Sequence, residues 1–85
     1  MSVYVDNARN VFGRMKMAHM IGDSSAELHA MAEAIGVARK WCQYPNTPEE
    51  HYDIALSKRT LAVAGGAIEI TTRELAKRVR ARRAA

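Results

Sequence analysis

The alternation of apolar and polar residues predicts several short strands. The stretch 3–5, Val-Tyr-Val, is β-prone. Residues 15–21 alternate with a period of two, which would place one set of side chains on a single face: Met15, Met17, His19 and Ile21. Residues 37–43 alternate in the same way, and 51–55 and 67–71 are rich in apolar and β-branched residues. We therefore expect strands in these segments, with 67–71 buried, and a loop over 7–14 that turns at Gly13.

Capping patterns predict helices between these strands. Ser24 and Glu27 have the spacing of a capping box, and the apolar positions that follow repeat with helical period up to Gly36. Ser57 is expected to cap a second helix that ends at 65–66. Thr71 and Glu74 form another capping box and open a C-terminal helix. A single helical turn is expected over 47–50.

The order of these elements predicts an α/β fold. We expect one layer of mixed sheet with about four to five short strands, two main helices and a basic C-terminal helix. No internal repeat or linker divides the chain. The predicted organisation is a single domain over 3–75 followed by a helical tail over 76–85.

Length and composition restrict the class of protein. A chain of 85 residues buries only about 60% of the surface that its unfolded form exposes. One cysteine excludes an intramolecular disulfide and fits a reducing compartment. No apolar run approaches the ~20 residues of a membrane span, and the first residues lack the pattern of a signal peptide. We expect a cytoplasmic protein that does not contact membranes and that gains stability by forming a homo-oligomer.

The positive charge is concentrated near the C-terminus. The formal net charge is +4, but residues 73–85 alone carry +5 and the remainder carries −1. Five cations of the tail are candidates for contacts with nucleic-acid phosphates: Lys77, Arg78, Arg80, Arg82 and Arg83. The alternative is that they form a solvated face that aids solubility. No aromatic residue is interleaved with these charges, so a stacking site for single strands is not indicated.

The segment HYD at 51–53 is the first candidate site. On a strand, His51 and Asp53 share a face because side chains alternate. A histidine and a carboxylate on one face can bind a divalent metal, or can form an acid–base pair in which the carboxylate orients the imidazole. Alternatively, Asp53 accepts a hydrogen bond near the N-terminus of the following helix. Both interpretations are open at this point.

The other two histidines have weaker patterns. His29 lies at the flank of the apolar stripe of its helix, where it can reach the edge of a cleft or remain solvated. His19 shares a strand face with apolar residues, which favours a half-buried structural role unless a polar group meets it. With Asp53 the three histidines could surround a divalent metal, but their spacing matches no metal motif. Cys42 is expected to be a small buried apolar residue.

Lys58 and Arg59 lie at the predicted N-terminus of a helix, where cations are unfavourable. Cations at the N-terminus of a helix are disfavoured by the helix dipole, and such departures cluster at functional sites. Together with backbone N–H groups, the two side chains would form a pocket for an anion or phosphate. The alternative is that both point into water.

The order of several short motifs resembles a known family. VYVD, RMKM-x-H, ELHAMA, R-x-W-x-Q, HYDI and SKR occur in the order found in the domain of unknown function 4031, over residues 3 to about 74. The positions that match its pattern are His19, Asp23, Glu27, His29, Trp41, Gln43, His51, Tyr52, Asp53, Lys58 and Arg59. Cys42 replaces the aromatic residue usual at that position, and the basic tail is expected to lie outside the shared pattern. The resemblance implies a bacterial or bacteriophage protein and implies no activity.

The polar residues support one main functional hypothesis. They would form a pocket for an anionic ligand such as a nucleotide or a nucleic-acid phosphate, which the protein binds or hydrolyses. His51 or His19 would be the general acid or base, Asp53 would orient it, and Lys58 and Arg59 would bind the charge. The remaining residues of the pocket would be His29, Gln43, Tyr52 and Asp23, with a divalent metal left open. The alternatives are a non-catalytic protein that binds a phage or host protein, and a nucleic-acid accessory protein that acts through its C-terminal helix.

Overall fold

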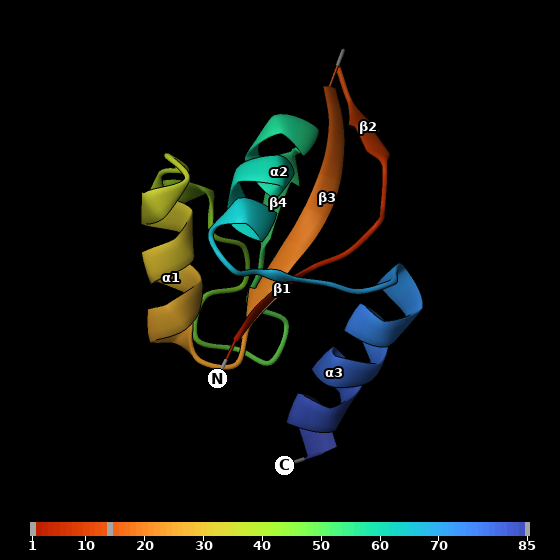
Figure 1. Ribbon diagram of the computed structural model, residues 1–85. Helices are drawn as coiled ribbons and strands as arrows, with labels where there is room; N and C mark the ends of the chain where they lie inside the picture. The colour runs from red at the N-terminus through yellow and green to blue at the C-terminus, as the bar shows by residue number, and fades with distance from the viewer. Residues whose placement is uncertain (1, 14, 85) are drawn as a thin grey trace.

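The strand β3, Met15–Gly22, is the centre of the fold and pairs with three other strands. The computed structural model describes residues 2–13 and 15–84. The other elements follow in the order β1 (Val3–Val5), β2 (Asn10–Phe12), α1 (Ser25–Ala34), the 3-10 helix η1 (Arg39–Trp41), β4 (Tyr52–Ala55), α2 (Leu56–Ala64), β5 (Ile68–Glu69) and α3 (Thr72–Ala84), with β3 between β2 and α1 (Figure 1). The predicted α/β fold with a single mixed sheet is confirmed.

The register of β3 shows how the sheet is arranged. Met17 is paired with both Asn10 and Ala55, so β2 and β4 lie on opposite edges of β3. Met20 is paired with both Val5 and Tyr52, so β1 also lies opposite β4. These pairs are antiparallel, and the parallel pair of β1 with β5 makes the sheet mixed.

The two faces of the sheet are covered by different helices. Met20, Tyr52 and Ile54 contribute to a buried cluster with Leu28 of α1 and Ala62 of α2. A second, smaller cluster on the opposite face consists of Tyr4, Ile21 and Ile70, against which Leu75 of α3 packs. Figure 1 shows α1 and α2 on one side of β3 and α3 on the other. Because side chains alternate along strands, His19, His51 and Asp53 belong to the face covered by α3.

The predicted capping residues of α1 and α3 make capping contacts. The backbone N–H of Glu27 donates to Ser24 Oγ over 3.2 Å at the start of α1. At the start of α3 the contacts are reciprocal, because Glu74 N–H donates to Thr71 Oγ1 and Thr71 N–H donates to the Glu74 carboxylate. Gly36 ends α1 with a φ of +80°, a conformation that glycine adopts without steric cost.

Several local predictions were wrong. Residues 10–12, expected in a loop, form β2 because the chain folds back as a hairpin onto β3. Residues 37–43, expected as a strand, contain η1 instead, and Trp41 is 62% exposed. In that segment Gln43 alone keeps strand character, as an isolated bridge to His51. Residues 47–50 form turns, not a helical turn. In 67–71, which was expected to be a buried strand, Ala67 and Ile70 are buried but both residues of β5 are exposed.

The predicted cap of the second helix was also wrong. Ala55 is the N-cap of α2 and Ser57 is already helical, because β4 runs directly into the helix. The N-cap makes no side-chain hydrogen bond. Lys58 and Arg59 therefore lie within the first turn and a half of α2.

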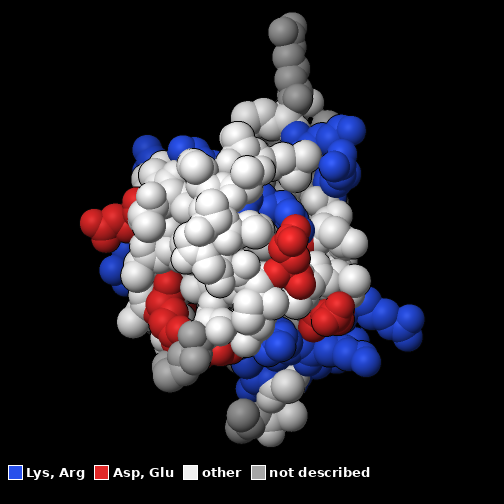
Figure 2. All heavy atoms as spheres, in the orientation of Figure 1, with Lys and Arg blue, Asp and Glu red and all other residues white. Residues whose placement is uncertain are grey.

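Helix α3 is docked on the domain through its cations. The guanidinium of Arg78 lies 3.9 Å from the centre of the Tyr4 ring. Arg82 donates a hydrogen bond to the carbonyl of Gly22, and Arg83 forms an ion pair with Glu49. Figure 2 shows blue side chains gathered at the lower end of the molecule, where α3 lies. No helix in 2–13 and 15–84 combines the length and the apolar character that crossing a membrane requires.

Candidate functional site

The buried carboxylate of Asp6 fixes one imidazole of the site. Asp6 follows β1 and is 0% exposed. Its Oδ1 accepts the backbone N–H of His19 over 2.8 Å and that of Ala8 over 3.2 Å. Its Oδ2 lies 2.7 Å from His19 Nδ1. This contact fixes the ring with Nδ1 toward Asp6 and Nε2 toward β4, as is usual when a carboxylate orients a histidine.

The Asp6–His19 contact changes the pKa of both groups. The hydrogen bond that His19 donates to Asp6, helped by the charges of Asp6 and Asp53, outweighs burial and raises the pKa of His19. Burial opposes ionisation of Asp6, but the hydrogen bonds from the side chain and backbone of His19 outweigh it and lower the pKa of the Asp6 carboxyl. Each group therefore favours the charged form of the other.

His51 is oriented in a similar way by the backbone. Its Nδ1 lies 2.7 Å from the carbonyl oxygen of Glu49, which can only accept, so Nδ1 carries the hydrogen of this bond. The ring of Tyr44 is stacked on His51 with centroids 6.1 Å apart. The His51 and His19 rings meet edge to face at 5.6 Å. In both rings Nδ1 is thus hydrogen-bonded to an oxygen acceptor, and Nε2 lies toward Asp53.

Asp53 lies where the two imidazoles converge. Its Oδ1 is 3.4 Å from His51 Nε2 and 3.7 Å from His19 Nε2. Gln43 Nε2 donates to Oδ2 over 2.6 Å. Oδ1 is shielded from solvent, and among the described residues no donor reaches it in hydrogen-bonding geometry. A buried carboxylate oxygen in this state calls for a cation, a proton or a ligand donor.

A cavity of about 810 Å³ opens beside the two histidines. One wall is the sheet face with His19, Ile21 and His51, and the opposite wall is α3. Helix α3 contributes apolar side chains and two cations, Arg80 and Arg83. The volume lies in the range of small-molecule sites.

Other residues predicted for the pocket lie elsewhere. Asp23 holds the start of β1, because its Oδ2 accepts the backbone N–H of Ser2 and the hydroxyl of Tyr4. Arg59 donates to the carbonyl of Asp6 over 2.7 Å and pairs with Glu69 over 2.9 Å.

The two cations of α2 therefore do not meet at one point. The Lys58 side chain extends toward Gly36. A Cβ atom added to Gly36 would lie 3.2 Å from Lys58 Nζ. The structure thus brings together His19, Gln43, His51 and Asp53, whereas Lys58 and Arg59 are not among the residues that line the cavity. The cations that face the cavity belong to α3 instead.

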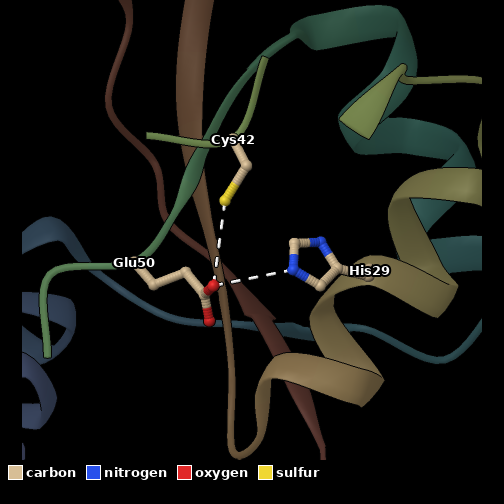
Figure 3. A group of neighbouring side chains, drawn as sticks. All are labelled: His29, Cys42 and Glu50. Carbon is tan, nitrogen blue, oxygen red and sulfur yellow. Dashed lines mark hydrogen bonds and ion pairs between the residues drawn. The ribbon is translucent and has the colours of Figure 1, made fainter. Parts of the chain in front are cut away.

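His29 and Tyr52 form a separate cluster on the face covered by α1. Their Nδ1 and Oη atoms are 2.7 Å apart. Figure 3 shows His29, Cys42 and Glu50 with one Glu50 oxygen between the other two groups. That oxygen, Oε2, is 3.5 Å from His29 Nε2 and 3.9 Å from Cys42 Sγ.

The ionisable groups of this cluster are also perturbed. Burial, followed by the nearby Glu50 carboxylate, raises the pKa of the Cys42 thiol. Burial also opposes the ionisation of Glu50, but hydrogen bonds from the Ser25 hydroxyl and the Asn46 N–H outweigh it and lower the pKa of that carboxyl. Burial is likewise the main cause that raises the pKa of Tyr52.

Two carboxylates of these clusters, Asp6 and Glu50, are not among the site residues predicted from the sequence. Asp6 directly follows the predicted strand 3–5 and alternation places it on the face of Tyr4, which is the one signal for its burial. Glu50 was assigned to a helical turn, although it is only 6% exposed. No sequence-local signal places Glu50 beside His29, which is 21 residues earlier.

Comparison with known proteins identifies a family. Neither the curated proteins nor the solved structures gave a match. A family model described as "Protein of unknown function (DUF4031)" matches residues 3–82. The matched range contains both clusters and most of α3, so the basic helix falls within the family model and not outside the shared pattern as expected. Because this range covers nearly the whole sequence, the chain belongs to the DUF4031 family of proteins of unknown function.

Proposed function

We propose that this protein binds a phosphorylated ligand, such as a nucleotide or a nucleic-acid phosphate, in the cavity between the sheet and α3, and hydrolyses a phosphodiester bond there. The observation that carries the proposal is the convergence of two oriented imidazoles at the cavity wall. His19 and His51 each have Nδ1 held by an acceptor, and both Nε2 atoms approach Asp53 Oδ1. Two histidines in this relation can act as a base and an acid in one reaction.

The expected reaction divides the proton transfers between the rings. The unprotonated imidazole removes a proton from water as the water oxygen forms a bond to phosphorus. The protonated imidazole donates its proton to the leaving alcohol oxygen as the second phosphorus–oxygen bond breaks. The products are a phosphomonoester and an alcohol. The raised pKa of His19 makes it the natural acid, and His51 is then the base.

Helix α3 would supply the positive charge for the phosphate. Arg80 and Arg83 line the cavity across from the histidines. Guanidinium groups bind phosphate oxygens through two parallel hydrogen bonds. The guanidinium of Arg83 forms an ion pair with Glu49, and both residues line the cavity together with His51.

A metal-assisted form of this reaction is the second candidate. It is favoured by the shielded Asp53 Oδ1, which no donor among the described residues reaches in hydrogen-bonding geometry. Two imidazole nitrogens and one carboxylate oxygen form a donor set that divalent transition metals accept. In that case the two histidines would hold the ion and would not transfer protons themselves.

The test is turnover of a dinucleotide phosphodiester, followed by ³¹P NMR, with and without a chelator. We expect His19→Gln and His51→Gln to lower the rate by about 10²–10⁴-fold while the circular dichroism spectrum remains that of the wild type. His29→Gln is the matched control, because His29 lies on the other face of the sheet. Loss of activity on chelation, in the wild type and in Cys42→Ser alike and with an unchanged circular dichroism spectrum, would select the metal-assisted form. A wild-type protein that neither binds nor cleaves the dinucleotide would contradict the proposal.

A further inference from the structure

Three side chains that commonly bind metals meet on the face of the sheet opposite the histidine pair. His29 comes from α1, Cys42 follows η1, and Glu50 precedes β4 (Figure 3). One ligand atom from each residue lies within 4.8 Å of the others. Glu50 is buried, and His29 and Cys42 are half-buried. This cluster plays no part in the function proposed above, and the inference from it stands independently.

We propose that His29, Cys42 and Glu50 bind one zinc-type divalent ion. Imidazole nitrogen, thiolate sulfur and carboxylate oxygen are the three donors that zinc uses in proteins. The sulfur donor disfavours Mg²⁺ and Ca²⁺, which prefer oxygen alone.

The spacing of the donors suits a tetrahedral ion. Bonds of about 2.0–2.3 Å hold the ligands of such an ion roughly 3.3–3.8 Å apart. Glu50 Oε2 already lies 3.5 Å from His29 Nε2 and 3.9 Å from Cys42 Sγ. Binding therefore needs only small side-chain movements.

Neighbouring groups orient two of the three ligands. The Tyr52 hydroxyl, on a residue that is 0% exposed, lies 2.7 Å from His29 Nδ1. When Nδ1–H donates to this oxygen, the lone pair of Nε2 faces Glu50. The Ser25 hydroxyl donates to Glu50 Oε1 over 2.5 Å and the Asn46 N–H donates to Oε2 over 3.0 Å, which together hold the carboxylate with Oε2 beside His29 and Cys42. Contacts of this kind fix the tautomer and direction of metal ligands.

The charges of the site also balance. A thiolate and a carboxylate carry two negative charges, which a divalent ion cancels while the neutral imidazole adds none. Three protein ligands leave one position of the tetrahedron for water. A cavity of about 390 Å³, lined by His29, Tyr52 and Arg39 among others, lies beside the cluster and provides access.

The structural consequence would be a crosslink. The ion would connect α1 to both ends of the segment 42–50, which contains turns and an isolated bridge but no helix or strand. A domain of this length buries a limited core, and bound metals commonly supply the missing stability. We assign the ion this stabilising role.

Cobalt(II) substitution tests the proposal, because a cobalt–thiolate bond gives an intense charge-transfer absorption in the near ultraviolet. We expect this band to saturate at one equivalent of Co²⁺, to be absent in Cys42→Ser and to remain in His51→Gln. We also expect Zn²⁺ to raise the Tm of the wild type and to leave the Tm of Cys42→Ser unchanged. A wild type without the band, or a band of equal strength in Cys42→Ser, would overturn the assignment. So would a wild-type Tm that Zn²⁺ does not raise.

Discussion

Asp6 Oδ2 lies 2.7 Å from His19 Nδ1, and Asp6 Oδ1 accepts the backbone N–H of the same histidine. The carboxylate thus binds both the side chain and the main chain of one residue. Asp6 comes from the end of β1 and His19 from β3, so this pair of contacts links two neighbouring strands at the edge of the cavity. The stability of the sheet and the orientation of the His19 ring therefore depend on the same interaction.

The first prediction concerns the pH dependence of stability. The folded protein binds the His19 proton more tightly than the unfolded chain. The contribution of His19 to the free energy of unfolding is therefore complete below the ordinary pKa of 6.5 and is lost as the pH rises through the raised pKa. The Asp6 pKa is lowered, so its contribution is present above the ordinary pKa of 3.8 and is lost as the pH falls through the lowered value. The pair stabilises the fold most between these two pH values.

Urea unfolding at a series of pH values measures this effect. The difference in unfolding free energy between wild type and His19→Gln should be largest between about pH 4 and 6.5 and should shrink as the pH rises further. Asp6→Asn should cost about 1–3 kcal/mol in that window, because an amide cannot accept all the donors around it. A wild-type curve that runs parallel to that of His19→Gln at every pH would show that the pair is not linked to stability.

The second prediction separates phosphate binding by the cavity from general attraction by the basic helix. Arg80 lines the cavity, whereas Lys77 lies on the same helix outside that lining. Arg80→Gln should weaken binding of a nucleoside monophosphate by roughly tenfold or more, since a charged hydrogen bond contributes about 1.5–3 kcal/mol. Lys77→Gln removes the same charge and should have a much smaller effect. Equal losses in the two variants, measured by calorimetry, would indicate binding by net charge alone.

The third prediction concerns the docking of α3. Leu75 is half-buried and packs on the cluster of Tyr4, Ile21 and Ile70, so Leu75→Ala should lower the free energy of unfolding by about 1–3 kcal/mol. Leu61 of α2 is 50% exposed, and Leu61→Ala should change it by less than about 0.5 kcal/mol. Because α3 is one wall of the cavity, Leu75→Ala should also weaken ligand binding. If the two leucine variants unfold at the same urea concentration, α3 does not pack as described.

The features that were correctly predicted from the sequence are local. The capping contacts of α1 and α3 connect residues three positions apart, and the alternation along 51–53 places His51 and Asp53 on one face. Such short-range patterns depend on the backbone geometry of a single element. The same alternation paired only His51 with Asp53, and it predicted a half-buried structural role for His19 unless a polar group met it.

The features that were missed depend on distant pairing. Residues 10–12 form a strand because they pair with β3. In segment 37–43 only Gln43 pairs with another backbone segment, so no strand forms there. Asp6 meets His19 across 13 residues, and Glu50 meets Ser25 across 25. The cations of the cavity were assigned to α2 because two adjacent cations in a first helical turn break a local rule. Tertiary packing instead directs Arg59 to Glu69 and Arg80 to the cavity.

The central claim is that His19 and His51 face a phosphate-binding cavity. The chain has three histidines, so each imidazole can be followed in ¹H–¹³C NMR spectra during a titration with a nucleoside monophosphate. We predict that the signals of His19 and His51 shift together and saturate at one equivalent, while the signal of His29, on the opposite face, stays unchanged. Shifts of equal size at all three histidines, or no shift at His19 and His51, would contradict the account.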